Sequence, residues 1–225
     1  MVQKQRIRKL FPASNTTEGF YSFFDYIIEG EGRKLFVLKG GPGVGKSTFM
    51  REIEHHALKN GFDVEEFRCS SDPDSIDAVS IPKLKLAVVD GTAPHIIEPR
   101  NPGITDEIIH LGDFWDREKL QRNGEKIINL SKKTGKLFNI AYNQLKEARV
   151  AYDEWKNYVQ DGLNSIAYKQ TVLELMKGIF LDVNEAESKG GRSRHLFASA
   201  ITPKGRSSYI ESLIEPSMRV YVLEG

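Results

Sequence analysis

The sequence predicts an α/β protein: a parallel sheet wrapped by helices, with a helical arm inserted into it or appended to it. Three observations support this prediction. A glycine-rich loop at 40–45 lies between an apolar run at 34–38 and a helix-forming stretch at 47–60. A second apolar run, 84–90, ends in an aspartate. From residue 105 onward, apolar residues recur at intervals of three and four, which is typical of amphipathic helices.

Residues 1–33 lead into the first strand. They begin with a basic and partly apolar stretch, 6–11, and lack the apolar core of a secretory signal. Thr17-Glu18-Gly19 resembles a helix start, so we predict a helix there. One side of this helix would carry a stripe that we expect to pack into the core: Phe20, Phe23, Phe24, Ile27 and Ile28.

The stretch from 40 to 48 fits G-x-x-x-x-G-K-[ST], the phosphate-binding P-loop, so the predicted fold is P-loop NTPase-like. Its glycines let backbone amides converge on phosphate oxygens, and the following helix adds a partial positive charge. Lys46 is predicted to reach the β- and γ-phosphates as a catalytic residue, and the Ser47 hydroxyl to bind Mg²⁺. The predicted nucleotide-binding residues are Gly40, Gly41, Pro42, Gly43, Val44, Gly45, Lys46, Ser47 and Thr48.

Two more strands are expected after the P-loop helix. Residues 63–69 form the first, and the polar stretch 70–75 follows it as a loop with a short helical turn. The run at 84–90 forms the second and ends in Asp90, like a Walker B strand that carries a carboxylate to the metal. We therefore predict Asp90 as a catalytic residue and, together with Ser47, as a ligand of Mg²⁺.

The identity of the catalytic base does not follow from the motifs. Many P-loop ATPases have a glutamate directly after the Walker B aspartate, whereas this chain has Gly91. Either the base comes from elsewhere, or hydrolysis is slow, or the phosphoryl acceptor is not water. The candidates by position are His95, Asp72, Asp74 and Glu98. The chain has no guanine-reading Asn-Lys-x-Asp motif, which favours ATP over GTP.

The predicted helical arm spans 111–186, after a nucleotide-binding core at 1–110. A break at Asp161-Gly162 divides its helical pattern, so we expect a long antiparallel helix pair. Its charged face is expected to be solvated, and the alternative is a lid or a partner-binding arm.

Charge and cysteine content narrow the possible partners. Lys+Arg 32 balances Asp+Glu 31, so we expect neither nucleic acid nor an anionic membrane as partner. No run reaches the ~18 apolar residues of a spanning helix. The single cysteine, Cys69, excludes an intramolecular disulfide and suits a reducing cytosol, so we expect a cytoplasmic protein.

An internal repeat is present near the end of the sequence. Residues 192–197 parallel residues 6–11 at an offset of 186 (192 − 6), and residues 222–225 parallel residues 37–40 at an offset of 185 (222 − 37). We therefore expect 187–225 to return to the core and begin a second, incomplete P-loop repeat. The hypothesis is that the chain is the first half of a two-copy protein.

These features together resemble a family of uncharacterised bacterial ATPases with two P-loop modules in tandem, over essentially the whole chain. The resemblance rests on residues 38–48, 69–75, 90–95, 111–115 and 194–197. It implies a nucleotide-binding P-loop fold and an ATPase activity, and it supplies no substrate. It also implies a second P-loop module as a possible partner, and a homo-oligomer is the other possibility.

The leading functional hypothesis is an ATP-binding, Mg²⁺-dependent ATPase. Arg192 or Arg194 would then be candidate arginine fingers, with a solvated basic loop as the alternative. A second hypothesis is a small-molecule or nucleotide kinase, whose acceptor pocket would be formed by the polar loops 70–75 and 91–103. A third is a nucleotide-gated interaction protein with slow turnover, whose helical arm binds an unknown partner.

Overall fold

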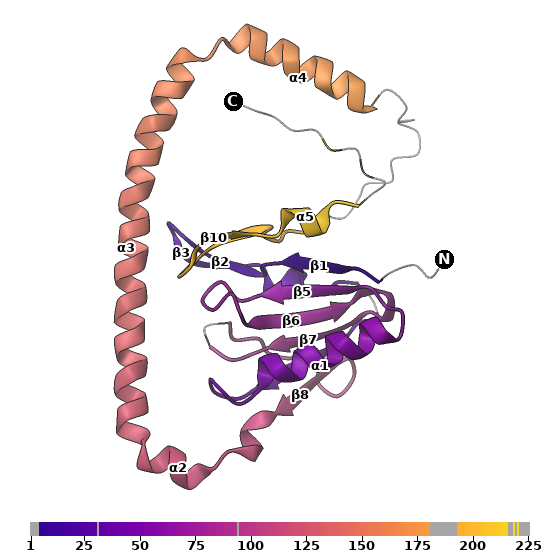
Figure 1. Cartoon of the computed structure of the whole chain (residues 1–225), viewed down its shortest axis with the longest axis vertical. Coiled ribbons are helices and arrows are strands. Elements are labelled where there is room, and N and C mark those ends of the chain that lie inside the picture. Colours follow the sequence, from indigo (N-terminus) through magenta and orange to yellow (C-terminus); the bar gives the residue numbers. More distant parts are fainter. Residues whose placement is uncertain are drawn as a thin grey trace.

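The structure, a computed structural model, describes residues 5–30, 32–93, 95–180, 193–215, 218 and 220. Figure 1 shows two sheets with a long helical arm beside them. Within the described residues, the larger sheet has the strand order β1-β5-β6-β7-β4-β8 and the smaller one β10-β9-β2-β3. The strands are β1 Ile7–Leu10, β2 Ala13–Thr16, β3 Gly19–Ser22, β4 Lys34–Lys39, β5 Val64–Arg68, β6 Ile76–Ile81, β7 Leu86–Asp90, β8 Asp106–His110, β9 Ser199–Thr202 and β10 Gly205–Ser208. The helices are α1 Lys46–Lys59, α2 Arg117–Arg122, α3 Gly124–Gly162, α4 Ser165–Phe180 and α5 Ile210–Leu213, with 3₁₀ turns η1 Phe24–Tyr26, η2 Pro82–Leu84 and η3 Leu111–Phe114.

The larger sheet is mixed, so the prediction of a parallel sheet was wrong in part. β4 pairs in parallel with β7 and β8, and β1 with β5, whereas β6 is antiparallel to both of its neighbours. Only residues 69–75 join β5 to β6, and only 82–85 join β6 to β7. Connections this short join antiparallel strands, because a parallel pair needs a crossover of a dozen or more residues. Strand β6 was not predicted from the sequence.

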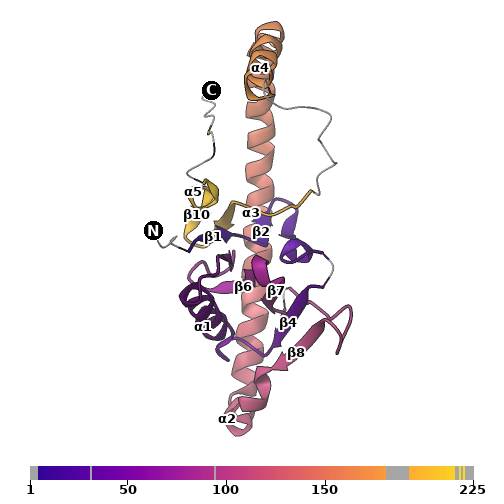
Figure 2. The same cartoon turned by 90° about the vertical axis from the view of Figure 1, so that its right-hand side faces the viewer.

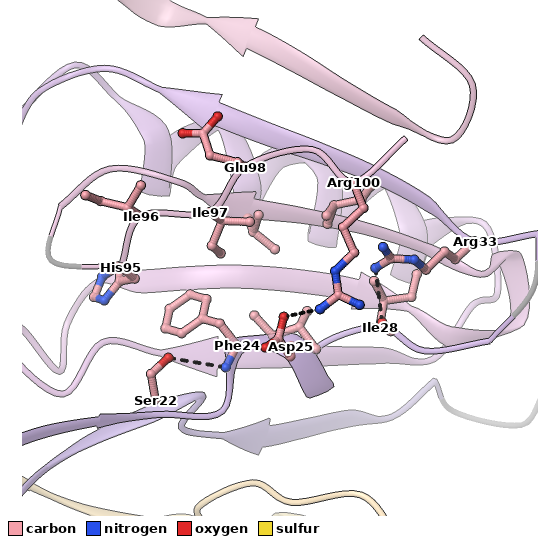
Figure 3. A pocket seen from close by; sticks show the side chains of 13 residues that line it. Ser22, Phe24, Asp25, Ile28, Arg33, His95, Ile96, Ile97, Glu98 and Arg100 are labelled. Atoms are coloured by element: carbon pink, nitrogen blue, oxygen red, sulfur yellow. Dashed lines mark hydrogen bonds and ion pairs between the residues drawn. The ribbon is translucent and has the colours of Figure 1, made fainter. Parts of the chain in front are cut away.

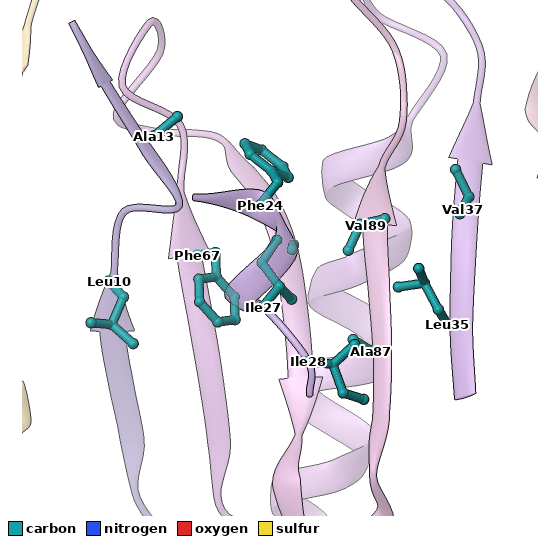
Figure 4. Close-up of a cluster of buried hydrophobic side chains, with 11 residues drawn as sticks. Leu10, Ala13, Phe24, Ile27, Ile28, Leu35, Val37, Phe67, Ala87 and Val89 are labelled. Carbon is teal, nitrogen blue, oxygen red and sulfur yellow. The ribbon is translucent and has the colours of Figure 1, made fainter. Parts of the chain in front are cut away.

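One helix covers one face of the sheet. α1 follows the glycine loop as predicted, and its Met50 and Ala57 pack on Leu38, Val79 and Val88. The opposite face carries no long helix in the described part of the chain. There, Phe24, Ile27 and Ile28 pack on the alternate residues of the strands (Figure 4), among them Leu35, Val37, Phe67, Ala78, Ala87 and Val89. The prediction of a sheet wrapped by helices therefore holds for one face only.

The predicted helix from Thr17 is a β-hairpin instead. β2 and β3 pair antiparallel with Asn15 opposite Phe20, and only the short η1 follows. Gly19 has φ 101°, which a helix interior excludes. The Thr16 hydroxyl stabilises the turn, because it accepts from Glu18 N and donates to Gly19 O. The aromatic residues still reach the core, but from a turn rather than from a helix.

The hairpin β9–β10 repeats the geometry of β2–β3. Thr202 Oγ1 donates to Gly205 O at 2.8 Å, and Thr16 Oγ1 donates to Gly19 O at the same distance. The amide two residues after each threonine donates back to its hydroxyl. A short helical turn follows each hairpin, η1 after the first and α5 after the second. The sequence repeat around 192–197 thus extends into a structural repeat of hairpin and turn.

The two repeats also pair with each other. Asn15 lies opposite Ile201, 186 positions later, in the antiparallel contact of β2 with β9. Phe11 and Phe197 exchange both backbone hydrogen bonds, at 2.8 and 3.0 Å. Equivalent residues facing each other in this way indicate a local pseudo-two-fold relation between the hairpins. The predicted second glycine loop start at 222–225 lies outside the described residues.

The arm is not the predicted antiparallel helix pair. α3 is one helix of 39 residues that ends at Gly162, the predicted break. α4 begins just after it and runs in a different direction instead of back along α3 (Figures 1 and 2). α3 contacts β2, where Tyr142 Oη donates to Asn15 Oδ1 at 3.0 Å. Many apolar side chains of α3 are exposed in the described structure, and Leu137 and Trp155 are each more than half exposed. None of the helices among the described residues has the length and apolar character needed to cross a membrane.

Two neighbouring carboxyl groups, Glu54 on α1 and Glu66 on β5, should make the stability of the fold depend on pH. Partial burial, with Glu66 of β5 beside it, raises the pKa of Glu54 on α1 from 4.5 to about 7. The folded chain therefore holds a proton between these values that the unfolded chain has released, so stability falls as pH rises from about 5 to 8. Because Glu54 is half-buried, we expect the free energy of unfolding to fall by about 1–2 kcal/mol, which is less than the full pKa shift would give.

Urea unfolding at several pH values between about 5 and 8 measures this loss. Glu54→Gln, which carries no titrating proton, should remove most of the decline. Glu52→Gln, on the exposed side of the same helix, is the matched control and should keep it. Equal pH profiles for wild type and Glu54→Gln would contradict the assignment.

Candidate functional site

The glycine loop, residues 40–45, joins the end of β4 to the start of α1. Gly43 and Gly45 have φ values of 78° and 95°, which only glycine adopts without strain. Gly45 is also the N-cap of α1, so the loop runs directly into the positive end of a helix of 14 residues. This strand–loop–helix arrangement agrees with the sequence prediction and suits a bound anion.

Lys46 is folded into the loop rather than exposed. The residue is 8% exposed, and its Nζ donates to Gly40 O at 2.6 Å and to Gly41 O at 3.0 Å. The same Nζ lies 3.5 Å from Asp90 Oδ2. The loop therefore places one ammonium group where its own carbonyls and a carboxylate converge, and phosphate oxygens are the kind of ligand that can replace the carbonyl partners.

Asp90 and Ser47 line the same cavity as this ammonium. β7 pairs with β4 so that Asp90 is opposite Leu38, and the two strands end at the same edge. Asp90 Oδ1 accepts from Thr92 N at 2.8 Å, which orients the carboxylate toward Lys46. Ser47 Oγ accepts from Ile76 N at 3.2 Å. A hydroxyl and a carboxylate are oxygen ligands of the type that Mg²⁺ binds, so these two side chains fit the predicted metal.

Both side chains line one cavity of about 530 Å³, which we call the loop cavity. This volume is in the range of small-molecule sites in proteins. The residues that line it are Pro42, Gly43, Gly45, Lys46, Ser47, Thr48, Cys69, Ser71, Asp72, Ser75, Ile76, Asp77, Asp90, Thr92, Ala93 and His95. The structure thus brings the predicted polar loops after β5 and β7 to the same space as the glycine loop.

The four candidate bases separate into two groups. His95 and Asp72 line the loop cavity. Asp74 is paired with Lys204, whose ammonium holds the pKa of that carboxyl below its usual range. Glu98 is paired with Lys39 at 2.6 Å and lines a different pocket. Asp74 and Glu98 are therefore poor candidates for a group that acts on a ligand in the loop cavity.

His95 stands between two cavities. On one side is the loop cavity, and on the other is a pocket of about 200 Å³ that also contains Phe24, Asp25 and Arg100 (Figure 3). The His95 ring stacks on Phe24 with centroids 4.6 Å apart and an interplanar angle of 17°. Figure 3 shows both rings at the end of this pocket. The stacking fixes the orientation of the imidazole ring.

Trp115 closes the outer side of the glycine loop, and no sequence signal assigned it a role. A Cβ placed on Gly41 would lie 3.1 Å from Cζ2 of the Trp115 ring. The segment η3 carries Trp115 there, because β8 ends beside β4 on the side away from β7. Residues 111–115 contributed to the family resemblance without an assigned role, and the contact with Gly41 depends on strand order.

The proposed arginine fingers are not available to the loop cavity among the described residues. Arg194 donates to Glu65 Oε1 at 3.0 Å and Oε2 at 2.8 Å, and to the carbonyls of Tyr26 and Ile27. Its guanidinium is thus part of the structural link between the C-terminal hairpin and the core. Arg192 lies outside the described residues.

The chain was also compared with known proteins. No family model matches it, and neither a curated protein nor a solved structure matches it significantly. Any proposed function therefore depends on the residues and the geometry of the site.

Proposed function

We propose that the chain binds ATP with Mg²⁺ in the loop cavity and hydrolyses it, within a P-loop NTPase-type core. The observation that carries the proposal is the arrangement of Lys46 Nζ, 3.5 Å from Asp90 Oδ2, in one cavity with Ser47. A triphosphate offers oxygens to the ammonium group and to the helix N-terminus. The resemblance to tandem P-loop ATPases is part of the same proposal.

Several residues of the loop cavity have roles in this proposed reaction. Lys46 exchanges its loop carbonyl partners for phosphate oxygens and stabilises the charge that develops on them. Ser47 and Asp90 would hold Mg²⁺, and Thr92 keeps the carboxylate oriented. Magnesium, when bound, neutralises phosphate charge and orients the β- and γ-oxygens. Of the four candidate bases, His95 and Asp72 line the cavity, and Asp72 stays available to accept a proton when His95 binds a metal.

A kinase activity is the second candidate, and the packing of Gly91 favours it. A Cβ at this position would lie 2.3 Å from Val37 Cγ1 and 3.1 Å from Ile97 O, so no glutamate fits directly after Asp90. The wall of the cavity also carries the polar side chains of Ser71, Asp72 and Thr92. Such a wall suits a hydroxyl-bearing small molecule as well as water.

A nucleotide-gated interaction is the third candidate. The exposed stripe of α3 offers a binding surface, and a hydrogen-bond chain joins it to the loop cavity. Tyr142 Oη donates to Asn15, whose Nδ2 donates to Ser70 O at 3.3 Å, next to Cys69. Deleting the arm should then abolish capture of a partner and leave nucleotide affinity unchanged.

Fluorescence of Trp115 tests nucleotide binding directly. The chain has two tryptophans, and Trp155 is exposed on α3, so a Trp155→Phe background isolates the ring beside Gly41. We expect saturable changes with MgATP, weaker binding of ATP without Mg²⁺, and weak competition by GTP. No change with ATP or GTP, confirmed by absence of heat in calorimetry, would contradict the proposal.

Ser47→Ala tests the metal role. Removing this hydroxyl should abolish most of the tighter binding that Mg²⁺ confers, about tenfold, while nucleotide affinity without metal stays the same. Ser131→Ala on the exposed face of α3 is the matched control and should bind MgATP like wild type. An unchanged Mg²⁺ dependence in Ser47→Ala would remove Ser47 from the metal site.

Phosphate release distinguishes the first two candidates. Release of inorganic phosphate from ATP alone supports hydrolysis. ADP formation that requires a hydroxyl-bearing metabolite, without phosphate release, supports a kinase.

A further inference from the structure

Three potential metal ligands converge in the wall of the loop cavity. Cys69 directly follows β5, Asp77 is the second residue of β6, and His95 lies in the segment after β7. One donor atom from each of the three lies within 4.8 Å of the others. β6 runs antiparallel to its neighbours, so its start meets the ends of β5 and β7 at one edge of the sheet. We call these residues the Cys69–Asp77–His95 cluster.

The cluster is buried and its polar atoms are short of partners. Cys69, Asp77 and His95 are 8%, 4% and 8% exposed. Asp77 Oδ2 and His95 Nδ1 are buried and form no hydrogen bond with the described part of the chain. Leaving a buried polar group unsatisfied costs about 1–3 kcal/mol, so Asp77 Oδ2 calls for a ligand, and the ring nitrogen beside it is His95 Nε2. A cation satisfies a carboxylate and an imidazole at once.

The spacing fits a small tetrahedral ion. Asp77 Oδ2 and His95 Nε2 are 3.5 Å apart. Two ligands about 2.1 Å from one ion at the tetrahedral angle lie roughly 3.4 Å from each other. The imidazole is held in place by its stacking on Phe24 and a tilted contact with Phe20, at 4.6 and 5.3 Å between centroids. Two of the three ligands are thus already at coordination distance from a common point.

A reactive-cysteine function does not fit the same residues. Burial, with the charge of Asp77 beside it, raises the pKa of the Cys69 thiol to about 12. A nucleophilic cysteine needs the opposite shift, toward thiolate at neutral pH, whereas a bound metal ion itself displaces the thiol proton.

We propose that Cys69, Asp77 and His95 bind a divalent transition metal ion of the zinc class, at a site separate from the predicted Mg²⁺ site. Thiolate, carboxylate and imidazole together are the ligand set of zinc and its neighbours, whereas Mg²⁺ prefers oxygen alone. Three protein ligands leave a fourth position open. Because all three residues line the loop cavity, that position faces the same space as Lys46, Ser47 and Asp90.

Cobalt(II) is the probe that tests this site. Co²⁺ replaces zinc-class ions and gives a thiolate-to-metal absorption band, and Cys69 is the only cysteine of the chain. The whole chain is stripped with a chelator, kept reduced with a phosphine, and titrated with Co²⁺ without nucleotide. We expect one equivalent to bind, with tetrahedral d–d bands and a thiolate band, and Zn²⁺ to abolish both while excess Mg²⁺ does not.

Variants assign the ligands. Cys69→Ser should remove the thiolate band, and both Cys69→Ser and His95→Gln should weaken Co²⁺ binding by at least about 100-fold. His55→Gln, on the exposed side of α1, is the matched control and should bind like wild type. Circular dichroism and thermal unfolding establish that each variant is folded before its titration is compared.

Several results would overturn the proposal. These are Co²⁺ binding without a thiolate band, binding unchanged in the folded Cys69→Ser or His95→Gln variant, displacement of Co²⁺ by Mg²⁺, and no binding by the folded wild type. The titration contains no nucleotide, so its outcome is independent of whether the chain binds ATP.

Discussion

Replacing Lys46 with alanine is expected to lower the affinity for MgATP by at least about 100-fold. The Lys46 ammonium is the cation within the loop cavity nearest to Asp90, and its partners are two loop carbonyls and that carboxylate. Charge-assisted hydrogen bonds are each worth about 1.5–3 kcal/mol, and about 2.7 kcal/mol corresponds to a factor of 100. Isothermal calorimetry with MgATP measures this loss.

The burial of Lys46 requires a stability control. Because the side chain is folded into the loop, its removal leaves the carbonyls of Gly40 and Gly41 without this donor. Thermal unfolding should nevertheless show a cooperative transition near that of wild type, since the loop lies at the edge of the sheet. Lys59→Ala, at the far end of the same helix, is the matched control and should bind MgATP normally. Equal affinities for Lys46→Ala and Lys59→Ala would exclude the lysine from the site.

Replacing Arg194 with alanine is expected to reduce the free energy of unfolding by about 3 kcal/mol. The Glu65 side chain is 3% exposed, and Arg194 supplies two of its hydrogen bonds, at 3.0 and 2.8 Å. The same guanidinium donates to the carbonyls of Tyr26 and Ile27. Removing Arg194 leaves the buried Glu65 carboxylate with Arg8, at 3.0 Å, as its remaining ion-pair partner. Losing one charged partner of a buried carboxylate is destabilising, because much of its desolvation is then uncompensated. Urea unfolding measures the change.

A surface arginine provides the comparison. Arg149 pairs with Asp153 at 2.7 Å on α3, where both side chains are about half exposed, so Arg149→Ala should leave the free energy of unfolding near that of wild type. Adding Glu65→Gln to Arg194→Ala should recover part of the loss, because the buried carboxylate that lost this partner is then neutral. Similar effects of Arg194→Ala and Arg149→Ala would show that the link between the C-terminal hairpin and the core is weak.

Local patterns predicted the parts of the fold whose cause lies within a few neighbouring residues. The strand before the glycine loop, the helix after it and the strand that ends at Asp90 all occur. Each depends on apolar runs, on glycine conformations or on helix-forming residues that are contiguous in the chain. The helix expected from Thr17 failed, because the positive φ of Gly19 and the Thr16 side chain stabilise a hairpin there.

What the sequence by itself determined is thus a glycine loop between a strand and a helix, an aspartate at the end of another strand, and a repeat in the chain. Only the tertiary structure decided that β6 is antiparallel, that Trp115 covers Gly41, that the repeated hairpins pair, and that Cys69, Asp77 and His95 meet. The reason is physical: these contacts join residues far apart in the chain, and strand order and register, rather than any local pattern, set which of them become neighbours.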